Sequence, residues 1–182
     1  YAERRKEEAY FEEWFRGQGY EVVTLDPGRF FEGAGDLLGF PDTWFGGYRQ
    51  RSDIRVFPTL SEWFHREIIP LELVDNRFYH LDTCLCPLSG GELLYFPPAF
   101  DHYGQEVLAE RVAPSRRLVV PEAEALRFAC NAVCVGKHVV LPAGCPETES
   151  LLTSHGYLPH PVPLDEFMKS GGSAKCLTLA LD

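Results

Sequence analysis

The chain has 182 residues, of which 45% are hydrophobic, 13% aromatic and 24% charged, values typical of a single globular domain with a substantial core. The net charge of −10 argues against nucleic-acid binding, which depends on neutralising phosphates, and is compatible with a cationic substrate. The apolar runs are too short to span a membrane, and the charged N-terminal residues do not resemble a secretory signal. We therefore expect a cytoplasmic protein with no nucleic-acid or membrane partner.

Six cysteines are present, and no two of them have the C-x-x-C spacing of a zinc ribbon or a thioredoxin-like motif. Cys130 and Cys134 lie four residues apart, but no matching second pair of ligands follows them. Most of the cysteines stand among apolar residues, so we expect small buried side chains in a reducing compartment. The sequence therefore predicts no metal and no cofactor.

The first predicted element is an amphipathic helix over residues 4–16, which the glycines that follow bring to an end. Its apolar stripe consists of Tyr10, Phe11, Trp14 and Phe15. A strand is predicted over residues 21–25, directly after the glycines.

A pattern of strand, strand, helix and strand then occurs three times, with a period of about 45–50 residues that is typical of repeat architectures. Asp101 is a favourable N-cap for the second helix. The helices are predicted over residues 60–67, 101–111 and 148–155. The strands of the three copies are predicted at 35–38, 43–45 and 71–74, at 79–84, 93–96 and 118–120, and at 132–135, 138–141 and 161–164. A final strand is predicted over residues 176–181.

The alternation of apolar and polar residues along these strands also predicts which side chains form the core. The expected core residues are Val22, Leu37, Leu73, Leu94, Val119, Val133, Val140 and Leu179.

The first group with chemical potential is His80 and Asp82, two residues apart in the predicted strand 79–84. Side chains two apart on a strand share a face, so the imidazole and the carboxylate would project together. Such a pair can act as a general acid and base. The alternative is a histidine at a strand edge beside a solvated aspartate.

Two glycine-rich segments carry further candidates. Glu32 and Asp36 flank the turn 33–35, where glycines allow close backbone packing beside an inward-facing carboxylate. Cys176 follows the loop 170–175 at the start of the last predicted strand, a position that suits a nucleophilic thiol. The alternatives are an ordinary exposed turn for the acids and a buried structural cysteine.

The order of these segments is more specific than any one of them. Residues 32–36 (Glu-Gly-Ala-Gly-Asp), 79–83 (Tyr-His-Leu-Asp-Thr) and 171–176 (Gly-Gly-Ser-Ala-Lys-Cys) together resemble the guanidino-group-modifying, or pentein, superfamily. The resemblance is strongest to bacterial proteins of the dimethylarginine dimethylaminohydrolase and amidinotransferase type, and residues 95–101 and 126–132 extend it.

The resemblance implies an α/β fold of ββαβ modules in a five-bladed α/β propeller, with about three and a half modules present. It also implies that residues 1–182 form a single catalytic domain that lacks the N-terminal modules of the full family fold. The family implies a small-molecule guanidine as the partner, and a homo-oligomer stays an open alternative.

The resemblance further implies a role for each candidate. Cys176 would attack the guanidinium carbon, His80 would transfer protons, and Glu32 would orient His80. Asp82 would bind guanidinium nitrogens, and Asp36 would bind substrate or hold the structure. Arg51 would bind a substrate carboxylate, with Arg49 as the alternative and a surface-loop role for Arg51 equally open.

Three readings of the activity stay open. The first is a hydrolase that acts on the guanidinium carbon–nitrogen bond of arginine or a methylated arginine through a covalent thiouronium intermediate, giving a ureido product and an amine. The second is an amidinotransferase with the same intermediate. The third is a catalytically incomplete fragment or a binding module, which would lack a cysteine of heightened reactivity.

Overall fold

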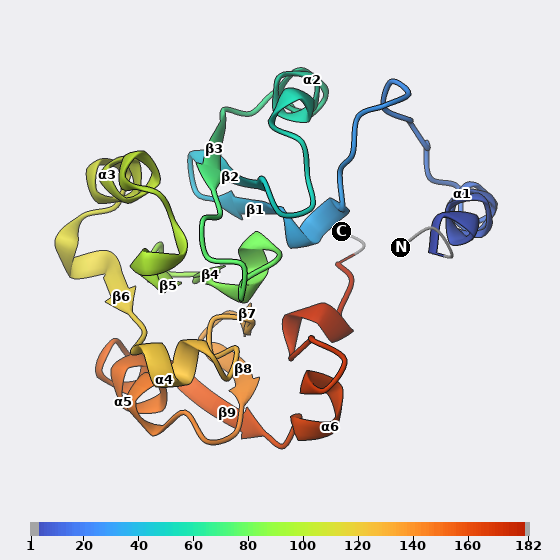
Figure 1. Cartoon of the computed structure of the whole chain (residues 1–182). Coiled ribbons are helices and arrows are strands. Elements are labelled where there is room, and N and C mark those ends of the chain that lie inside the picture. The colour runs from blue at the N-terminus through green and yellow to red at the C-terminus, as the bar shows by residue number, and fades with distance from the viewer. Residues whose placement is uncertain (1–3, 181–182) are drawn as a thin grey trace.

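The computed structural model describes residues 4–180, which form three small sheets arranged side by side (Figure 1). Each sheet has three strands in chain order. The first two strands are antiparallel, and the third returns parallel to the second. A parallel return needs a crossover, and a helix lies in each one. The predicted α/β class and the strand–strand–helix–strand order are therefore confirmed.

The elements are short, as expected from the close spacing of turn residues. The strands of the described chain are β1 (Leu37–Phe40), β2 (Thr43–Tyr48), β3 (Ile68–Glu72), β4 (Leu85–Pro87), β5 (Leu93–Tyr95), β6 (Arg117–Val119), β7 (Val133–Val135), β8 (His138–Pro142) and β9 (Leu158–Val162). The α-helices are α1 (Glu8–Gly17), α2 (Phe57–Phe64), α3 (His102–Arg111), α4 (Glu122–Ala125), α5 (Pro146–Ser154) and α6 (Asp165–Met168). Asp101 caps α3 as predicted, because its side chain accepts a hydrogen bond from Gly104.

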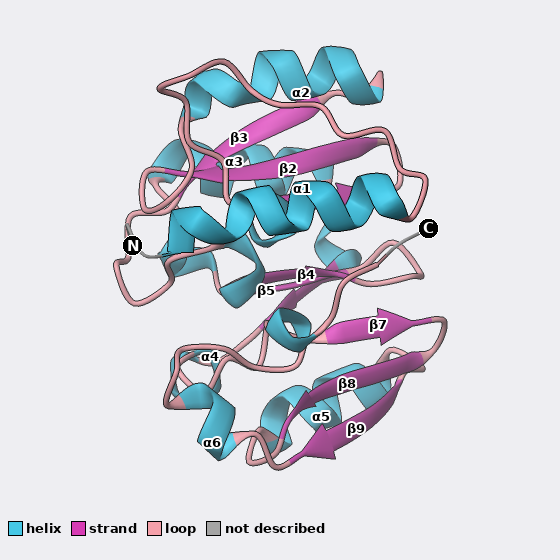
Figure 2. Cartoon of the chain, turned by 90° about the vertical axis from the view of Figure 1, so that its right-hand side faces the viewer, coloured by secondary structure: helices cyan, strands magenta, loops and turns pink. Residues whose placement is uncertain are grey.

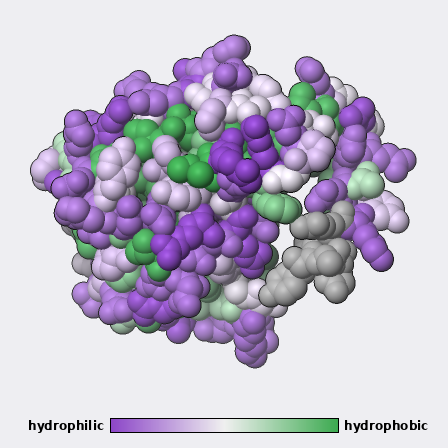
Figure 3. All heavy atoms as spheres, turned by 45° about the horizontal axis from the view of Figure 1, so that its top comes forward, coloured by the Kyte–Doolittle hydropathy of each residue, from purple (hydrophilic) through white to green (hydrophobic). Residues whose placement is uncertain are grey.

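The arrangement leaves the first strand of each sheet on the inner side. β4 contacts both β1 and β7, while α2, α3 and α5 lie on the outer side (Figure 1). The same succession of sheets is visible from the side in Figure 2, and Figure 1 shows that α1 lies apart from the first sheet. The face seen in Figure 3 is mainly hydrophilic, in keeping with the net charge of −10.

One main hydrophobic core joins the three sheets, and a small second cluster forms around Val56, Phe57 and Leu60. Leu73 and Leu94 are buried, as predicted. Leu37 is partly buried against the second cluster. Val22, Val133 and Val140 are only partly buried, and the predictions for Val119 and Leu179 were wrong because both are exposed. Alternation is a poor guide here because a strand can be covered on both faces, and all three residues of β5 are buried.

The predicted N-terminal helix forms over nearly the expected residues, but it buries none of its side chains. Tyr10, Phe11 and Trp14 of the apolar stripe are all exposed. The strand predicted at residues 21–25 was wrong, because this stretch pairs with no other strand among the described residues. It runs as an extended link toward the first sheet.

Two predicted strands that carry site residues were also wrong. Residues 79–84 form a turn and a short 3-10 helix (Leu81–Thr83), and β4 starts only at Leu85. The final stretch forms a 3-10 helix (Lys175–Leu177) and then irregular chain up to residue 180, while residue 181 lies outside the described residues. In the described chain, no helix combines the length and the apolar character that crossing a membrane requires.

Candidate active site

Segments far apart in the sequence meet around one pocket of about 470 Å3. Its wall includes His80, Asp82 and Cys176. Ala34 and Gly35 also line this pocket, as do Ser170 and Gly172 of the loop after α6. Three of the predicted site residues are therefore brought together, although the strand expected to align two of them does not form.

Asp36 fixes the turn that carries His80 and Asp82. Its carboxyl group is buried, and one oxygen accepts a hydrogen bond from the Ser52 hydroxyl at 2.7 Å. The other oxygen accepts from the backbone N–H of Leu81 at 2.9 Å. Burial raises the pKa of Asp36, and these hydrogen bonds oppose the rise. Both oxygens are thus engaged within the protein, which favours the structural role over direct contact with a substrate.

Glu32 lies behind His80 and connects it to Arg51. Its Oε2 atom is 2.7 Å from Nε2 of His80, and Nη1 of Arg51 lies 3.2 Å from the same oxygen. Partial burial works against ionisation of Glu32, but the His80 hydrogen bond and the Arg51 charge leave its pKa below the ordinary value. A carboxylate that stays ionised in this place can orient the imidazole and stabilise its charged form.

Cys176 and Asp82 face each other. The Cys176 residue is exposed to the pocket, but its Sγ is partly buried, 3.9 Å from Oδ2 of Asp82. Burial, followed by the charge of Asp82, raises the pKa of the Cys176 thiol. Burial also raises the pKa of Asp82 to about 6. Each group therefore resists a second negative charge nearby, and a cation bound between them would lower both pKa values.

One oxygen of Asp82 is left without a donor. Among residues 4–180, Oδ1 of Asp82 is buried and accepts no hydrogen bond. Buried polar atoms almost always have partners, and an unpaired carboxylate oxygen carries a high desolvation cost. The Asp82 side chain as a whole lines the pocket beside the thiol, so this carboxylate is an acceptor suited to the N–H groups of a bound molecule.

The structure adds two residues that the pattern analysis did not select. Tyr79 lies beside His80 in the pocket wall, and the Tyr79 hydroxyl donates to the carbonyl of Gly171. The Arg51 guanidinium lies over the Tyr79 ring, 5.2 Å from its centre. Asn131 is fully buried behind the cysteine loop. A lone amide among apolar neighbours was the one sequence signal that could have marked it.

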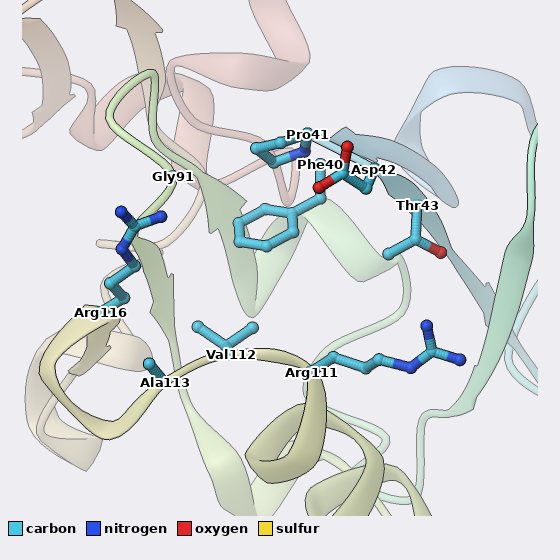
Figure 4. Close-up of a pocket in the computed structure, with 9 residues that line it drawn as sticks. All are labelled: Phe40, Pro41, Asp42, Thr43, Gly91, Arg111, Val112, Ala113 and Arg116. Carbon is cyan, nitrogen blue, oxygen red and sulfur yellow. The ribbon is translucent and has the colours of Figure 1, made fainter.

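A different cavity of about 370 Å3 lies between the β1–β2 turn and the chain after α3 (Figure 4). Arg111 and Arg116 stand on opposite sides of Val112 there, and the cavity wall contains no cysteine or histidine. It therefore offers no thiol or imidazole of the kind expected for this site. Within residues 4–180, no three His, Cys, Asp or Glu side chains converge in a way that could hold a metal ion.

No family model matches the chain. It is 48% identical over 179 residues to the bifunctional arginine dihydrolase/ornithine cyclodeaminase AgrE of Nostoc sp., a match that covers 97% of this chain and 26% of that protein. It is also 38% identical over 181 residues to the N(G),N(G)-dimethylarginine dimethylaminohydrolase of Mycobacterium tuberculosis, covering 100% of this chain and 59% of that protein. The chain thus spans about a quarter of the first relative's length.

Solved structures give the same picture. The N-terminal domain of ArgZ, an arginine dihydrolase from cyanobacteria, solved with bound substrate, matches with a TM-score of 0.95 and 44% identity over 98% of this chain and 67% of that one. The same domain covalently bound to a reaction intermediate matches with a TM-score of 0.96 and 44% identity, covering 100% and 68% of the two chains. These arginine dihydrolases and dimethylarginine dimethylaminohydrolases are relatives of the chain, which belongs to the guanidino-group-modifying (pentein) superfamily.

Proposed function

We propose that this chain carries the catalytic centre of a hydrolase that cleaves a guanidinium carbon–nitrogen bond of arginine or a methylated arginine. The reaction would pass through a covalent thiouronium intermediate on Cys176 and give a ureido product and an amine. The observation that carries the proposal is the Asp82 carboxylate 3.9 Å from the Cys176 sulfur, in the wall of a pocket that also holds His80.

The type of unpaired group distinguishes a guanidine from an acyl substrate. A cysteine protease needs hydrogen-bond donors for the oxyanion that develops at its substrate carbonyl. A guanidinium is already cationic and offers planar N–H donors, so its site needs acceptors. Asp82 supplies a buried acceptor 3.9 Å from the Cys176 sulfur through its other oxygen. The pocket therefore fits a guanidinium carbon held against the thiol.

In the first half of the reaction, the Cys176 thiolate forms a bond to the central carbon of the guanidinium. His80, held by Glu32 at 2.7 Å, then protonates the departing nitrogen, and the carbon–nitrogen bond breaks with release of the amine. In the second half, His80 removes a proton from water as the water attacks the same carbon. The carbon–sulfur bond breaks with its electron pair returning to sulfur, which restores the thiolate, and the ureido product leaves after its hydroxyl proton passes to solvent.

The substrate itself would help to generate the nucleophile. Without a ligand, burial and the charge of Asp82 keep the pKa of the Cys176 thiol above its ordinary value, so the thiol is neutral near pH 7. A guanidinium in contact with both groups stabilises the thiolate and the ionised Asp82. A low thiol reactivity in the ligand-free protein is therefore compatible with an enzyme and does not by itself indicate a binding module.

Arg51 has two roles to choose between. Its ion pair with Glu32 and its position over Tyr79 hold its guanidinium near the catalytic group. From there it could bind the α-carboxylate of an amino-acid substrate, the role we assign to it, or support Glu32 alone. A planar guanidinium suits bidentate binding of a carboxylate.

The three sheets resemble repeating units of a larger fold. We propose that they are three blades of a five-bladed propeller, that α1 and residues 20–25 belong to a preceding blade, and that residues 1–182 act as one catalytic domain. The remaining blades would come from chain outside this sequence. The apolar stripe on α1 supports this arrangement, because Tyr10, Phe11 and Trp14 are exposed in the described chain. A homo-oligomer would cover it equally well.

A product assay tests the proposed activity. The purified chain is incubated with arginine, dimethylarginine or agmatine, and the ureido product and released amine are quantified, with Cys176→Ser as the control. We expect ureido product and amine in equal amounts, and neither with the variant. Formation of a new guanidine from an added amine acceptor would instead indicate an amidinotransferase. No product from any of the three would contradict a competent hydrolase.

A further inference from the structure

Asn131 joins the two halves of the candidate site from behind. It is fully buried, on the chain between α4 and β7, and its side chain contacts both the cysteine loop and the Asp82 turn. Its Oδ1 accepts the backbone N–H of Ser173 at 3.1 Å and that of Cys176 at 3.3 Å. Its Nδ2 donates to the backbone carbonyl of Asp82 at 3.1 Å. The backbone carbonyl of Asn131 accepts a fourth hydrogen bond from Lys175 at 3.1 Å.

The chemistry of this position requires a carboxamide. The cysteine loop presents two N–H donors and the Asp82 turn presents a carbonyl acceptor, so the bridging group must accept on one side and donate on the other. A short carboxamide has both functions on one rigid plane, whereas a carboxylate cannot donate and an aliphatic side chain can do neither. Loss of the amide would leave three buried backbone groups without partners, which is a substantial penalty.

We propose that Asn131 is a positioning residue that sets the separation between the Cys176 sulfur and the Asp82 carboxylate. The inference rests on the proposed function, in which one guanidinium must meet both groups at once. The sulfur has to reach the central carbon while Asp82 holds nitrogens of the same planar group. A single side chain tied to both backbones fixes that distance, and neither segment is held in a regular strand that could do so.

The contact between the two groups has a measurable consequence that needs no turnover. The charge of Asp82 raises the pKa of the Cys176 thiol, so replacement of Asp82 by Asn should shift the pH profile of Cys176 alkylation to lower pH. If Asn131 holds the two groups together, this shift depends on Asn131. The shift therefore reports their separation in the folded protein.

The experiment measures the rate of Cys176 alkylation by iodoacetamide against pH, with the modified peptide quantified by mass spectrometry. Four chains are compared: the unchanged protein, Asp82→Asn, Asn131→Ala and the double variant. We expect Asp82→Asn to move the profile clearly in the Asn131 background and to have little effect in the Asn131→Ala background. An equal shift in both backgrounds would overturn the proposal.

Two further variants separate positioning from general destabilisation. Thr148→Ala removes a fully buried hydroxyl that donates to Glu124 at 2.5 Å; neither residue lines the pocket, so this variant should leave the Asp82-dependent shift unchanged. Asn131→Ser keeps an acceptor for one loop N–H but is too short to bridge, so it should lose the shift like Asn131→Ala. Retention of the shift in Asn131→Ser would contradict bridging, and circular dichroism confirms that each chain is folded.

The activity assay keeps this test distinct from the proposed function. If the unchanged chain hydrolyses a guanidine, Asn131→Ala should lower kcat by about 100-fold, the effect of misplacing reacting groups by about 1 Å. If the unchanged chain hydrolyses none, the proposed function fails, while the alkylation profiles still decide whether Asn131 holds the two groups together.

Discussion

The imidazole of His80 occupies the space that a side chain on residue 35 would need. A Cβ added to Gly35 would lie 2.7 Å from Nδ1 of His80, closer than real Cβ atoms approach other atoms. The φ angle of Gly35 is not in the left-handed region, so the glycine is needed for this close approach and not for its backbone conformation. Glu32 holds the opposite nitrogen of the same ring at 2.7 Å. The 32–36 motif thus clamps the imidazole from both sides.

Gly35→Ala should therefore lower activity without unfolding the protein. The added methyl group displaces the imidazole from its place against Gly35 and disturbs its contact with Glu32, and we expect kcat to fall by about 10- to 100-fold, the range associated with a displaced general acid or base. The measurement is steady-state kinetics together with thermal unfolding. Gly17→Ala is the matched control, because a Cβ there meets nothing within 4 Å. Unchanged kcat in Gly35→Ala would contradict the clamp.

The ionised Asp82 carboxylate should lower the free energy of unfolding. Its folded-state pKa of about 6 lies above the ordinary aspartate value of about 3.9, so folding favours the protonated form and the ionised carboxylate weakens the fold. The penalty is absent below about pH 4, grows between the two pKa values and is complete above about pH 6, where it reaches about 3 kcal/mol. Asp82→Asn should therefore raise the melting temperature at pH 8 but not at pH 4. An equal effect at both pH values would contradict this assignment.

The pH profiles of kcat/KM and kcat should differ. In the free protein, kcat/KM should rise with pH as Asp82 ionises near pH 6, and continue to rise toward the raised pKa of the Cys176 thiol. In the complex, the bound guanidinium lowers the pKa of the thiol, so kcat should level off at a lower pH. Rate measurements at saturating and at low substrate concentrations separate the two. Profiles that level off at the same pH would exclude activation of the thiol by the substrate.

Arg51→Ala should distinguish the two roles open to Arg51. If the guanidinium binds the substrate's α-carboxylate, KM for arginine should rise by about 10- to 100-fold, as for the loss of a charge-assisted contact. Agmatine has the same guanidinium without the carboxylate, and its KM should stay nearly constant. Equal losses for the two substrates would show that Arg51 acts through Glu32, which it contacts at 3.2 Å.

The repeat of the fold could be read from the sequence because turn residues and apolar runs are local signals. All three helices of the repeats and the order of their strands are confirmed. The strand predicted at 79–84 failed for a non-local reason. The Asp36 carboxylate binds the N–H of Leu81, and this contact across 45 residues holds a turn in a stretch with strand propensity. The segment 21–25 has apolar residues but no neighbouring strand to pair with in the described chain.

The residues of the site also divide into those that local patterns predict and those that depend on contacts between distant segments. Cys176, His80 and Asp82 were selected by residue type and motif order, and the structure brings them into one pocket wall. Asn131 and Tyr79 gain their importance from contacts with residues 42 and 92 positions away, Ser173 and Gly171, and no local pattern encodes such contacts. The residues that carry the chemistry could therefore be predicted, while those that position them required the fold.

The most direct test of the account is the mass of Cys176 during turnover of arginine, measured on acid-quenched protein. The account predicts an adduct that contains the whole of arginine less one ammonia, located on the peptide with Cys176 and absent from Cys176→Ser. Attack of Cys176 on the guanidinium carbon, with a terminal nitrogen leaving as ammonia, gives an adduct of this mass. An adduct of a bare amidino group would mean that the ornithine part leaves first, as in an amidinotransferase, and would contradict the proposed hydrolysis to a ureido product. Product formation with no adduct at Cys176 would contradict the covalent mechanism itself.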